Sequence, residues 1–230
     1  MNFSRATWKV ALPTLILILS PGFLQGQDGP LGISPAVGVT IGTSGIGGEL
    51  GARLHERLGA RLGVSWIPIE PEIDEDEHDV TGSAELPSPI IRLMADFFPW
   101  GGSFHLTAGV EHFSGGLTLH GIPSDSVAIG DSKYSAEEIG EIEGKFWGSE
   151  TAPYFGIGWQ KVTGRVQPYF ELGAALTGAP KASIRILGPA GGQVDLEEDL
   201  EEEIREIEDD ASSFVAYPHL MFGLRVRLGG

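Results

Sequence analysis

The sequence predicts an all-β protein, an eight-stranded antiparallel up-and-down transmembrane β-barrel with one acidic amphipathic helix near the C-terminus. Three observations carry this prediction. Apolar and polar residues alternate with a period of two in segment after segment, which is the pattern of half-buried strands. No stretch beyond the N-terminal region approaches about 18 consecutive apolar residues, so strands rather than helices would have to cross a membrane. Glycine makes up 34 of 230 residues, and this excess is typical of tight turns and close backbone approach.

The N-terminal region has the organisation of a secretory signal peptide. Arg5 and Lys9 precede an apolar run, and Gly26 supplies a small residue for cleavage. The run is shorter than the roughly 20 residues that a membrane-spanning helix needs. We therefore expect export to the cell outer membrane, with an uncleaved anchor as the alternative. The expected organisation is a signal peptide at 1–26, a short N-terminal linker at 27–34 and a barrel domain at 35–230, which includes an acidic helix at 194–211.

Each predicted strand has one apolar face and one face of small or charged residues. Around Phe170, for example, apolar Leu172 alternates with polar Tyr169 and Glu171. Several segments reach the roughly 9–11 residues that a tilted strand needs to cross the outer membrane. Bacterial barrels have even strand numbers, which favours eight. In chain order the alternating segments are 37–41, 46–54, 58–66, 91–97, 104–110, 154–159, 166–176 and 214–228.

The alternation changes phase twice, at Gly42-Thr43-Ser44-Gly45 and near 111–113. A slip of one residue exchanges the two faces of a strand, and a glycine-containing bulge is the ordinary way to accommodate it. We expect bulges at both places. The stretch 177–180 is either a turn before a separate strand at 182–187 or a bulge in one long strand.

The polar faces indicate which side of the sheet is inside. They carry mostly glycine, serine and threonine with isolated charges of both signs, which suits the narrow, filled interior of an eight-stranded barrel. A soluble β-structure with an apolar interior is the alternative. Aromatic residues near segment ends, including Tyr154 and Tyr169, fit girdles at the membrane interfaces. The predicted polar network of the lumen consists of Glu49, Arg53, Arg61, Arg92, Asp96, His105, Glu111, Glu171, His219, Arg225 and Arg227.

Short connections alternate with long ones, as in outer-membrane barrels. The long connections include 68–88 and 120–144. The stretch 194–211 breaks the β pattern, because Leu196, Leu200, Ile204 and Ile207 form one helical stripe and acidic residues cover the rest. This helix is either a docking element or a solvated helix folded onto the barrel end.

Several of these residues carry a family likeness. Asp96-Phe97-Phe98-Pro99, the element Ala152-Pro153-Tyr154-Phe155-Gly156-Ile157-Gly158-Trp159, Tyr217-Pro218-His219 and the acidic helix together resemble small Gram-negative outer-membrane β-barrels, loosely of the OmpW or OmpA type. The likeness covers about 35–228 and implies a barrel whose function is obscure. Such barrels usually end on an aromatic residue, whereas this sequence ends Arg227-Leu228-Gly229-Gly230.

Composition and motifs exclude several functions. The net charge of −17 argues against a nucleic-acid partner, because phosphate binding needs a basic surface, and zero cysteines leave no thiolate chemistry. The histidines show no metal-ligand spacing. His112 and Ser114 share a strand face, but a lipid enzyme would need a third group beside them. The acidic run 70–79 lacks the order of a calcium loop. We therefore expect no enzyme activity, catalytic residue, cofactor or metal.

The sequence thus predicts a structural or interaction barrel with a side-chain-filled polar lumen. Its expected partners are outer-membrane lipid and lipopolysaccharide. A monomer is expected because a closed barrel has no free strand edge. A narrow channel for small solutes and a soluble periplasmic barrel that binds an apolar ligand are the alternatives.

Overall fold

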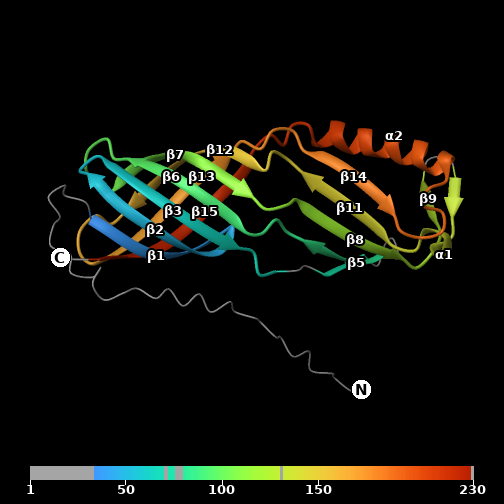
Figure 1. Ribbon diagram of the computed structural model, residues 1–230, viewed down its shortest axis with the longest axis horizontal. Coiled ribbons are helices and arrows are strands. Elements are labelled where there is room, and N and C mark those ends of the chain that lie inside the picture. The colour runs from blue at the N-terminus through green and yellow to red at the C-terminus, as the bar shows by residue number, and fades with distance from the viewer. Residues whose placement is uncertain (1–33, 70–71, 76–79, 130–131, 229–230) are drawn as a thin grey trace, which may run out of the picture.

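The computed structural model describes residues 34–69, 72–75, 80–129 and 132–228 (Figure 1). The predicted signal peptide and all but the last residue of the linker lie outside these residues, as does part of the acidic run 70–79. Two regions follow one another along the long axis of the molecule, a barrel and a β-sheet extension with α2 beside it.

The barrel confirms the predicted fold class. Eight antiparallel strands close in the order β1-β15-β13-β12-β7-β6-β3-β2. Each strand pairs with its neighbours in chain order, and β1 closes the barrel against the last strand, so the topology is up-and-down. The barrel strands are β1 (Ser34–Gly42), β2 (Gly45–His55), β3 (Leu58–Trp66), β6 (Ile90–Phe97), β7 (Phe104–Phe113), β12 (Thr151–Gln160), β13 (Val166–Ala175) and β15 (Tyr217–Arg227).

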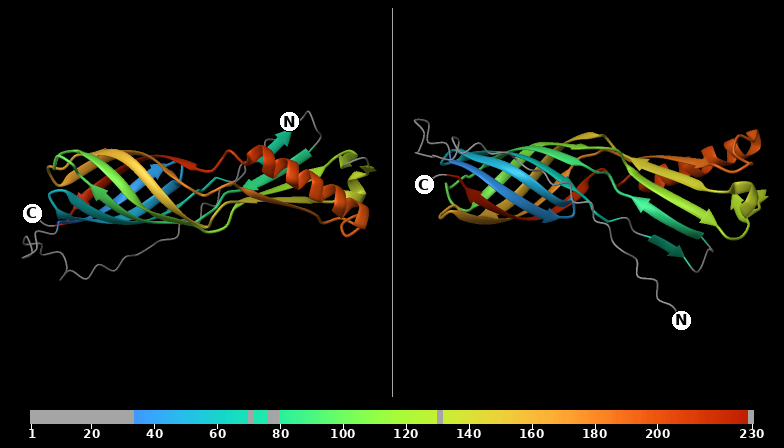
Figure 2. Two further views of the ribbon diagram at one scale, coloured as in Figure 1. Left: turned by 90° about the horizontal axis from the view of Figure 1, so that it is seen from above. Right: turned by 60° about the horizontal axis from the view of Figure 1, so that its bottom comes forward.

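The two ends of the barrel differ. At the end that we call the turn end, short connections at 56–57, 98–103 and 161–165 join the strands, and β1 begins where β15 ends. The opposite end carries the extension, a five-stranded sheet in the order β14-β11-β8-β5-β4 (Figure 2). Its elements are β4 (Glu72–Glu75), β5 (Val80–Glu85), β8 (Leu117–Pro123), β11 (Ile142–Trp147) and β14 (Lys181–Ile186), with the small sheet β9 (Val127–Ile129) and β10 (Ser132–Tyr134), and the helices α1 (Ala136–Ile139) and α2 (Val194–Ala211).

The extension is built from the long connections between barrel strands, and the strands that these connections contain were not predicted. Barrel strands lead into extension strands after short breaks, as β7 does into β8 across Ser114, Gly115 and Gly116. The second phase slip, near 111–113, is not a bulge: β7 alternates regularly to its end, where Phe113 is buried on the same face as Glu111. Similarly, β13 ends at Ala175 and β14 begins at Lys181, which settles the open question in favour of a separate strand.

The first phase slip is also not a bulge. Gly42 pairs directly with Gly45, and Thr43 and Ser44 form the tight turn of the β1–β2 hairpin. Gly45 has a φ of 86°, a conformation that glycine adopts without strain. A Cβ there would lie 2.0 Å from the carbonyl oxygen of Trp66, so a residue with a side chain would not fit at this position. A hairpin turn can move the apolar positions from odd to even residue numbers just as a bulge does. The alternation pattern alone therefore does not distinguish a turn from a bulge.

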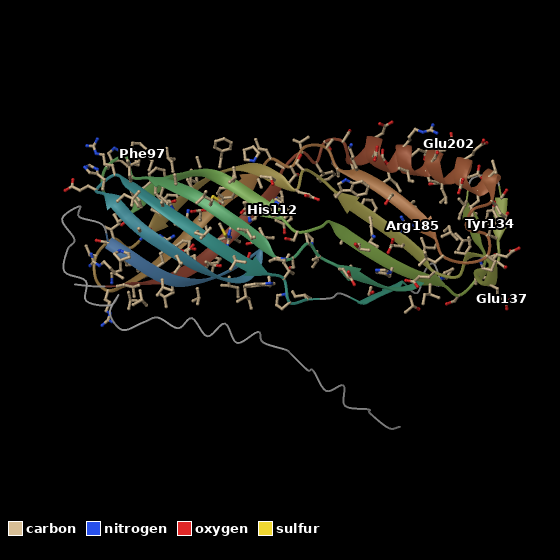
Figure 3. All side chains as sticks on the ribbon, in the orientation of Figure 1. Phe97, His112, Tyr134, Glu137, Arg185 and Glu202 are labelled. Carbon is tan, nitrogen blue, oxygen red and sulfur yellow. The ribbon has the colours of Figure 1, made fainter. Side chains whose placement is uncertain are left out.

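The outer surface of the barrel is apolar. Side chains such as Val39, Leu93 and Phe155 are more than half exposed, although the same strands bury charged residues on the other face. Figure 3 shows Phe97 pointing outward from the barrel wall. An exposed apolar surface that surrounds a barrel is the arrangement that lipid requires. The exposed apolar residues of the barrel strands include Val39, Ile41, Ile46, Leu50, Leu62, Ile91, Leu93, Phe97, Leu106, Val110, Phe155, Ile157, Leu172, Phe222 and Leu224.

The predicted aromatic girdle is partly wrong. Trp66, Trp100 and Trp159 are exposed, as expected for interfacial residues, but Tyr154 and Tyr169 are buried inside the barrel. Both tyrosines lie on the inward-facing side of their strands, which is also the side that carries the buried charged residues. In the described part of the chain, no helix is long and apolar enough to cross a membrane.

The extension has a small core of its own. Leu196 of α2 is fully buried against Ile139, Ile186 and neighbouring residues, and Leu200 packs at the edge of this cluster. The side chain of Glu208 accepts a hydrogen bond of 2.9 Å from the backbone N–H of Ala182 in the edge strand β14. Helix α2 therefore covers one end of the sheet and satisfies part of an edge that would otherwise remain open.

Candidate functional site in the barrel lumen

The predicted polar residues lie along the lumen at different heights. Nine of them are buried on the inner face: Glu49, Arg61, Arg92, Asp96, His105, Glu111, Glu171, His219 and Arg225. Arg53 and Arg227 occupy the same faces of β2 and β15 but are only half-buried, because they lie at the turn end. Charged side chains are therefore distributed along the length of the lumen, and Arg53 and Arg227 lie at its opening at the turn end.

Arg61 is the centre of this column. Its Nη2 atom lies 2.7 Å from Asp96 Oδ1, 2.5 Å from Glu171 Oε2 and 3.0 Å from Thr107 Oγ1. Its Nη1 atom lies 3.9 Å from Glu49 Oε2. One guanidinium thus joins carboxylates from three other strands. Buried charges need such partners, and a guanidinium presents donors in several directions.

Glu171 is held from several sides. Tyr154 donates a hydrogen bond of 2.8 Å to its Oε1 atom, and Thr107 Oγ1 lies 3.0 Å from its Oε2 atom. His105 Nε2 lies 3.2 Å from the same oxygen. Tyr154 fits only because Gly173 faces it, since a Cβ at that position would lie 2.1 Å from the tyrosine hydroxyl. These contacts anchor the carboxylate in the middle of the lumen.

Another layer lies closer to the turn end. Arg225 pairs with Glu49 through its Nε atom and donates a hydrogen bond of 2.7 Å to Gln160 Oε1. Its guanidinium stacks 4.1 Å from the ring centre of Tyr169, whose hydroxyl donates to Glu49 at 3.0 Å. Gly223 leaves room for that ring, because a Cβ there would lie 2.0 Å from it. Glycines opposite Tyr154 and Tyr169 therefore make room for aromatic rings between the ions of the lumen.

The layer nearest the extension contains Glu111 and His219. Both side chains are fully buried, and their closest atoms are 2.8 Å apart. The angles of this contact do not satisfy hydrogen-bond geometry, so we treat it as a close electrostatic contact. Arg92 donates to Ser44 Oγ at 3.2 Å and to Thr40 Oγ1 at 3.3 Å, and it also contacts the sulfur of Met221.

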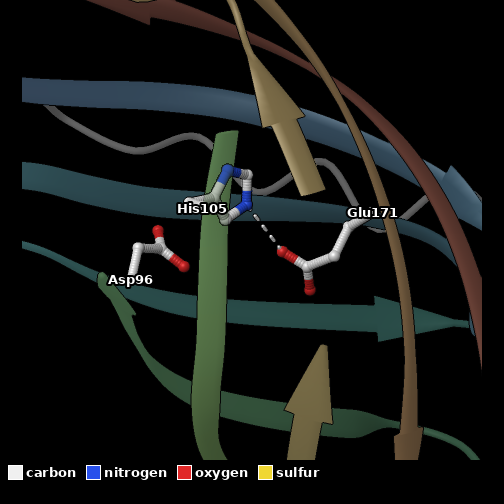
Figure 4. Close-up of side chains that lie close together, drawn as sticks. All are labelled: Asp96, His105 and Glu171. Carbon is white, nitrogen blue, oxygen red and sulfur yellow. Dashed lines mark hydrogen bonds and ion pairs between the residues drawn. The ribbon is translucent and has the colours of Figure 1, made fainter. Parts of the chain in front are cut away.

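One group in the lumen has the residue types of a metal site. Ligand atoms of Asp96, His105 and Glu171 all lie within 4.8 Å of one another (Figure 4). The Arg61 guanidinium, however, contacts both carboxylates at hydrogen-bond distance. A cationic side chain therefore already occupies the space between the two carboxylates.

The remaining sequence candidates do not form a site. His112 Nδ1 lies 3.0 Å from Thr151 Oγ1, and among the described residues no carboxylate orients its ring. The pair with Ser114 therefore lacks the third group that nucleophilic catalysis needs. The predicted lumen network does not include Tyr154, Tyr169 and Thr107. These residues alternate in step with the charged residues of their strands, and this pattern would have assigned them to the same face.

Comparisons with known proteins agree with the geometry. No family model matches the chain, and no curated protein matches it. The crystal structure of CarO from Acinetobacter baumannii is similar at 21% identity and a TM-score of 0.56, covering 84% of this chain and 96% of that one. CarO2 from the same organism is similar at 20% identity and a TM-score of 0.54, covering 84% and 98%. The fold is that of an outer-membrane β-barrel.

The match confirms the predicted resemblance to small outer-membrane barrels at the level of the fold. An outer-membrane location also agrees with the two surfaces of the barrel, because lipid surrounds the apolar exterior and the polar side chains are enclosed in the interior. Because the likeness covers more of the chain than the barrel strands, it includes connections outside the barrel.

Proposed function

We propose that this protein is a closed, non-conducting outer-membrane barrel that holds an acidic sheet-and-helix extension at the cell surface for interaction with other molecules. The observation that carries the proposal is the ion-pair network across the lumen. Arg61 and Arg225 join Glu49, Asp96 and Glu171 from different strands, so opposite charges pair with one another.

Packing supports a closed lumen. The interior of an eight-stranded barrel is just wide enough to be filled by side chains. Here Tyr154 and Tyr169 lie among the ions, and both are buried. A narrow channel for small solutes would need these groups to separate, which would leave buried charges without partners at a cost of several kcal/mol.

The extension supports an interaction role. Long connections of outer-membrane barrels face the exterior, whereas short turns face the periplasm. The outer face of α2 is strongly acidic, with Arg205 as its single basic residue, and Figure 3 shows Glu202 on this helix, far from the barrel. Its exposed acids are Glu197, Glu198, Glu201, Glu202, Glu203, Glu206, Asp209 and Asp210. The surrounding lipid and lipopolysaccharide, a monomeric state and the absence of catalysis belong to this proposal.

Planar bilayer recordings test the closed lumen. We expect wild-type protein to insert without discrete conductance steps and the double variant R61A/Y154A to conduct, because it removes the central cation and a large side chain. Stable conductance steps from the wild-type barrel would instead support the channel alternative.

Cysteine labelling tests the orientation, and the chain contains no native cysteine that would interfere. Glu202→Cys on α2 and Arg165→Cys at the turn end form a matched pair of exposed positions. On intact cells, a membrane-impermeant maleimide should label only E202C, and R165C should react only after the outer membrane is permeabilised. The opposite pattern would place the extension in the periplasm and overturn the surface role.

A further inference from the structure

A cavity opens at the turn end of the barrel, opposite the extension. Its volume is about 700 Å³, within the range of ordinary small-molecule sites. Its lining includes three arginines, two aromatic residues and two carboxylates, namely Arg53, Arg225, Arg227, Phe98, Trp100, Glu56 and Asp96. We call this cavity the vestibule.

The vestibule exists because small residues face inward where β1 to β3 begin or end. Ala36 of β1 pairs with Gly51 of β2 on one side and with Arg227 of β15 on the other. Ser34 pairs with Arg53 in the same way. Serine, alanine and glycine fill little of the lumen, so space remains between the long side chains of β2 and β15.

The arginines of the vestibule outnumber its carboxylates. Arg225 and Asp96 both line the cavity, but Glu49 pairs with the first and Arg61 with the second. This leaves Arg53 and Arg227 against the single carboxylate of Glu56 in the lining. Arg53 and Arg227 are bonded to backbone carbonyl oxygens, and among the described residues neither has a carboxylate within 4.0 Å.

The positions of these two guanidiniums are restrained. Arg53 lies 3.6 Å above the ring centre of Phe98 and donates to the carbonyl oxygen of Gly101 at 3.3 Å. Arg227 donates to the carbonyl oxygen of Gly164 at 3.2 Å. Part of the donor capacity of each remains, since a guanidinium carries five N–H groups. Restrained cations lose less conformational entropy when a ligand binds.

We propose that the vestibule binds a small oxyanion, a carboxylate or a phosphate group, between Arg53 and Arg227. Guanidinium groups bind such anions through paired, charge-assisted hydrogen bonds. The exposed cations Arg57, Lys161 and Arg165 surround the mouth and attract anions toward it, although the whole chain carries a net charge of −17. The anion comes either from a soluble metabolite or from the headgroup of a phospholipid beside the barrel.

Calorimetric titration of the full-length protein in an uncharged detergent tests the site. The probes are inorganic phosphate, succinate and short-chain phosphatidylglycerol, with putrescine as a cationic control. Saturable binding of an anionic probe, without binding of putrescine, is expected. Preference for the free anions would identify a soluble source, and preference for the lipid would identify a headgroup; both outcomes support an oxyanion site.

Matched variants separate the vestibule from the general charge of the turn end. Arg53→Gln and Arg227→Gln should each weaken binding about tenfold, because each removes charge-assisted hydrogen bonds. Arg165→Gln removes an equal charge from an exposed turn residue outside the cavity, so it loses only a screened long-range attraction and should weaken binding less than about twofold. Absence of binding by every anionic probe, or equal weakening by all three variants, would overturn the proposal.

A conservative variant protects the test from a folding defect. Arg227→Lys keeps the charge but loses the planar pair of donors, so we expect a folded barrel with severalfold weaker binding. Unchanged affinity in R227K and R227Q, with normal heat-dependent gel mobility, would also refute the site. The experiment is independent of lumen closure, because a conducting barrel would retain the same vestibule.

Discussion

Replacement of Arg61 by methionine tests whether the charge network stabilises the barrel. Methionine keeps much of the length and volume of the side chain but removes the cation. The substitution leaves the Thr107 hydroxyl, which has one proton to donate, 2.9 Å from Asp96 Oδ1 and 3.0 Å from Glu171 Oε2. Glu171 also keeps its contacts with Tyr154 and His105. Two buried carboxylates then lose their only direct arginine partner among the described residues.

The expected loss of stability is large. Removing one partner of a buried ion pair typically costs about 3–5 kcal/mol, because the remaining charge stays away from water. Arg61 is 4% exposed and contacts more than one carboxylate, so we expect a value near the upper end of this range. The triple variant R61M/D96N/E171Q removes the uncompensated charges and should recover most of the loss.

Urea unfolding in lipid vesicles, followed by tryptophan fluorescence, measures this effect with the four tryptophans that follow the predicted signal peptide, Trp66, Trp100, Trp147 and Trp159. Arg57→Met is the matched control, because Arg57 is an exposed residue of a turn. A loss in R61M no larger than that in R57M, or a triple variant as unstable as R61M, would refute the view that buried charge pairing holds these strands together.

Two further substitutions test the outer surface and the extension. Leu93→Arg places a charge on an apolar side chain position that is 58% exposed. If this position lies near the membrane midplane, the substitution should destabilise the barrel in lipid by about 2–4 kcal/mol. Urea unfolding measures the effect, and unchanged stability would place Leu93 outside the hydrocarbon layer. Glu208→Ala removes the acceptor of the Ala182 N–H, so hydrogen exchange at Ala182 should become about fivefold faster, which corresponds to a loss of about 1 kcal/mol. An unchanged exchange rate would mean that α2 does not protect this edge.

Local alternation explains why much of the barrel could be predicted. Successive side chains of a strand point to opposite faces, so the sequence assigns Glu49, Arg61 and Glu171 to one face without any knowledge of their partners. The same reasoning fails where the chain reverses. At Gly42–Gly45 a turn and a bulge give the same change of phase, and we expected a bulge where the structure has a hairpin.

The extension was missed for a different reason. Strands β5, β8, β11 and β14 pair across long sequence separations, and their partners lie in other connections of the barrel. Short strands with weak alternation become stable only when those partners lie beside them. The acidic helix was predicted correctly because a stripe of period 3.6 is a local signal.

The sequence by itself determined the strand periodicity, the acidic helix and the face on which each lumen residue lies, since these depend on neighbours within a few positions. Only the tertiary structure decided the height of each residue along the lumen and its partner across it. Strand register and barrel closure place Arg61 among three carboxylates, whereas Arg53 and Arg227 lie at the mouth with no carboxylate of the described residues within 4.0 Å. The physical reason is that pairing of charges depends on distances between strands, whereas alternation describes a single strand.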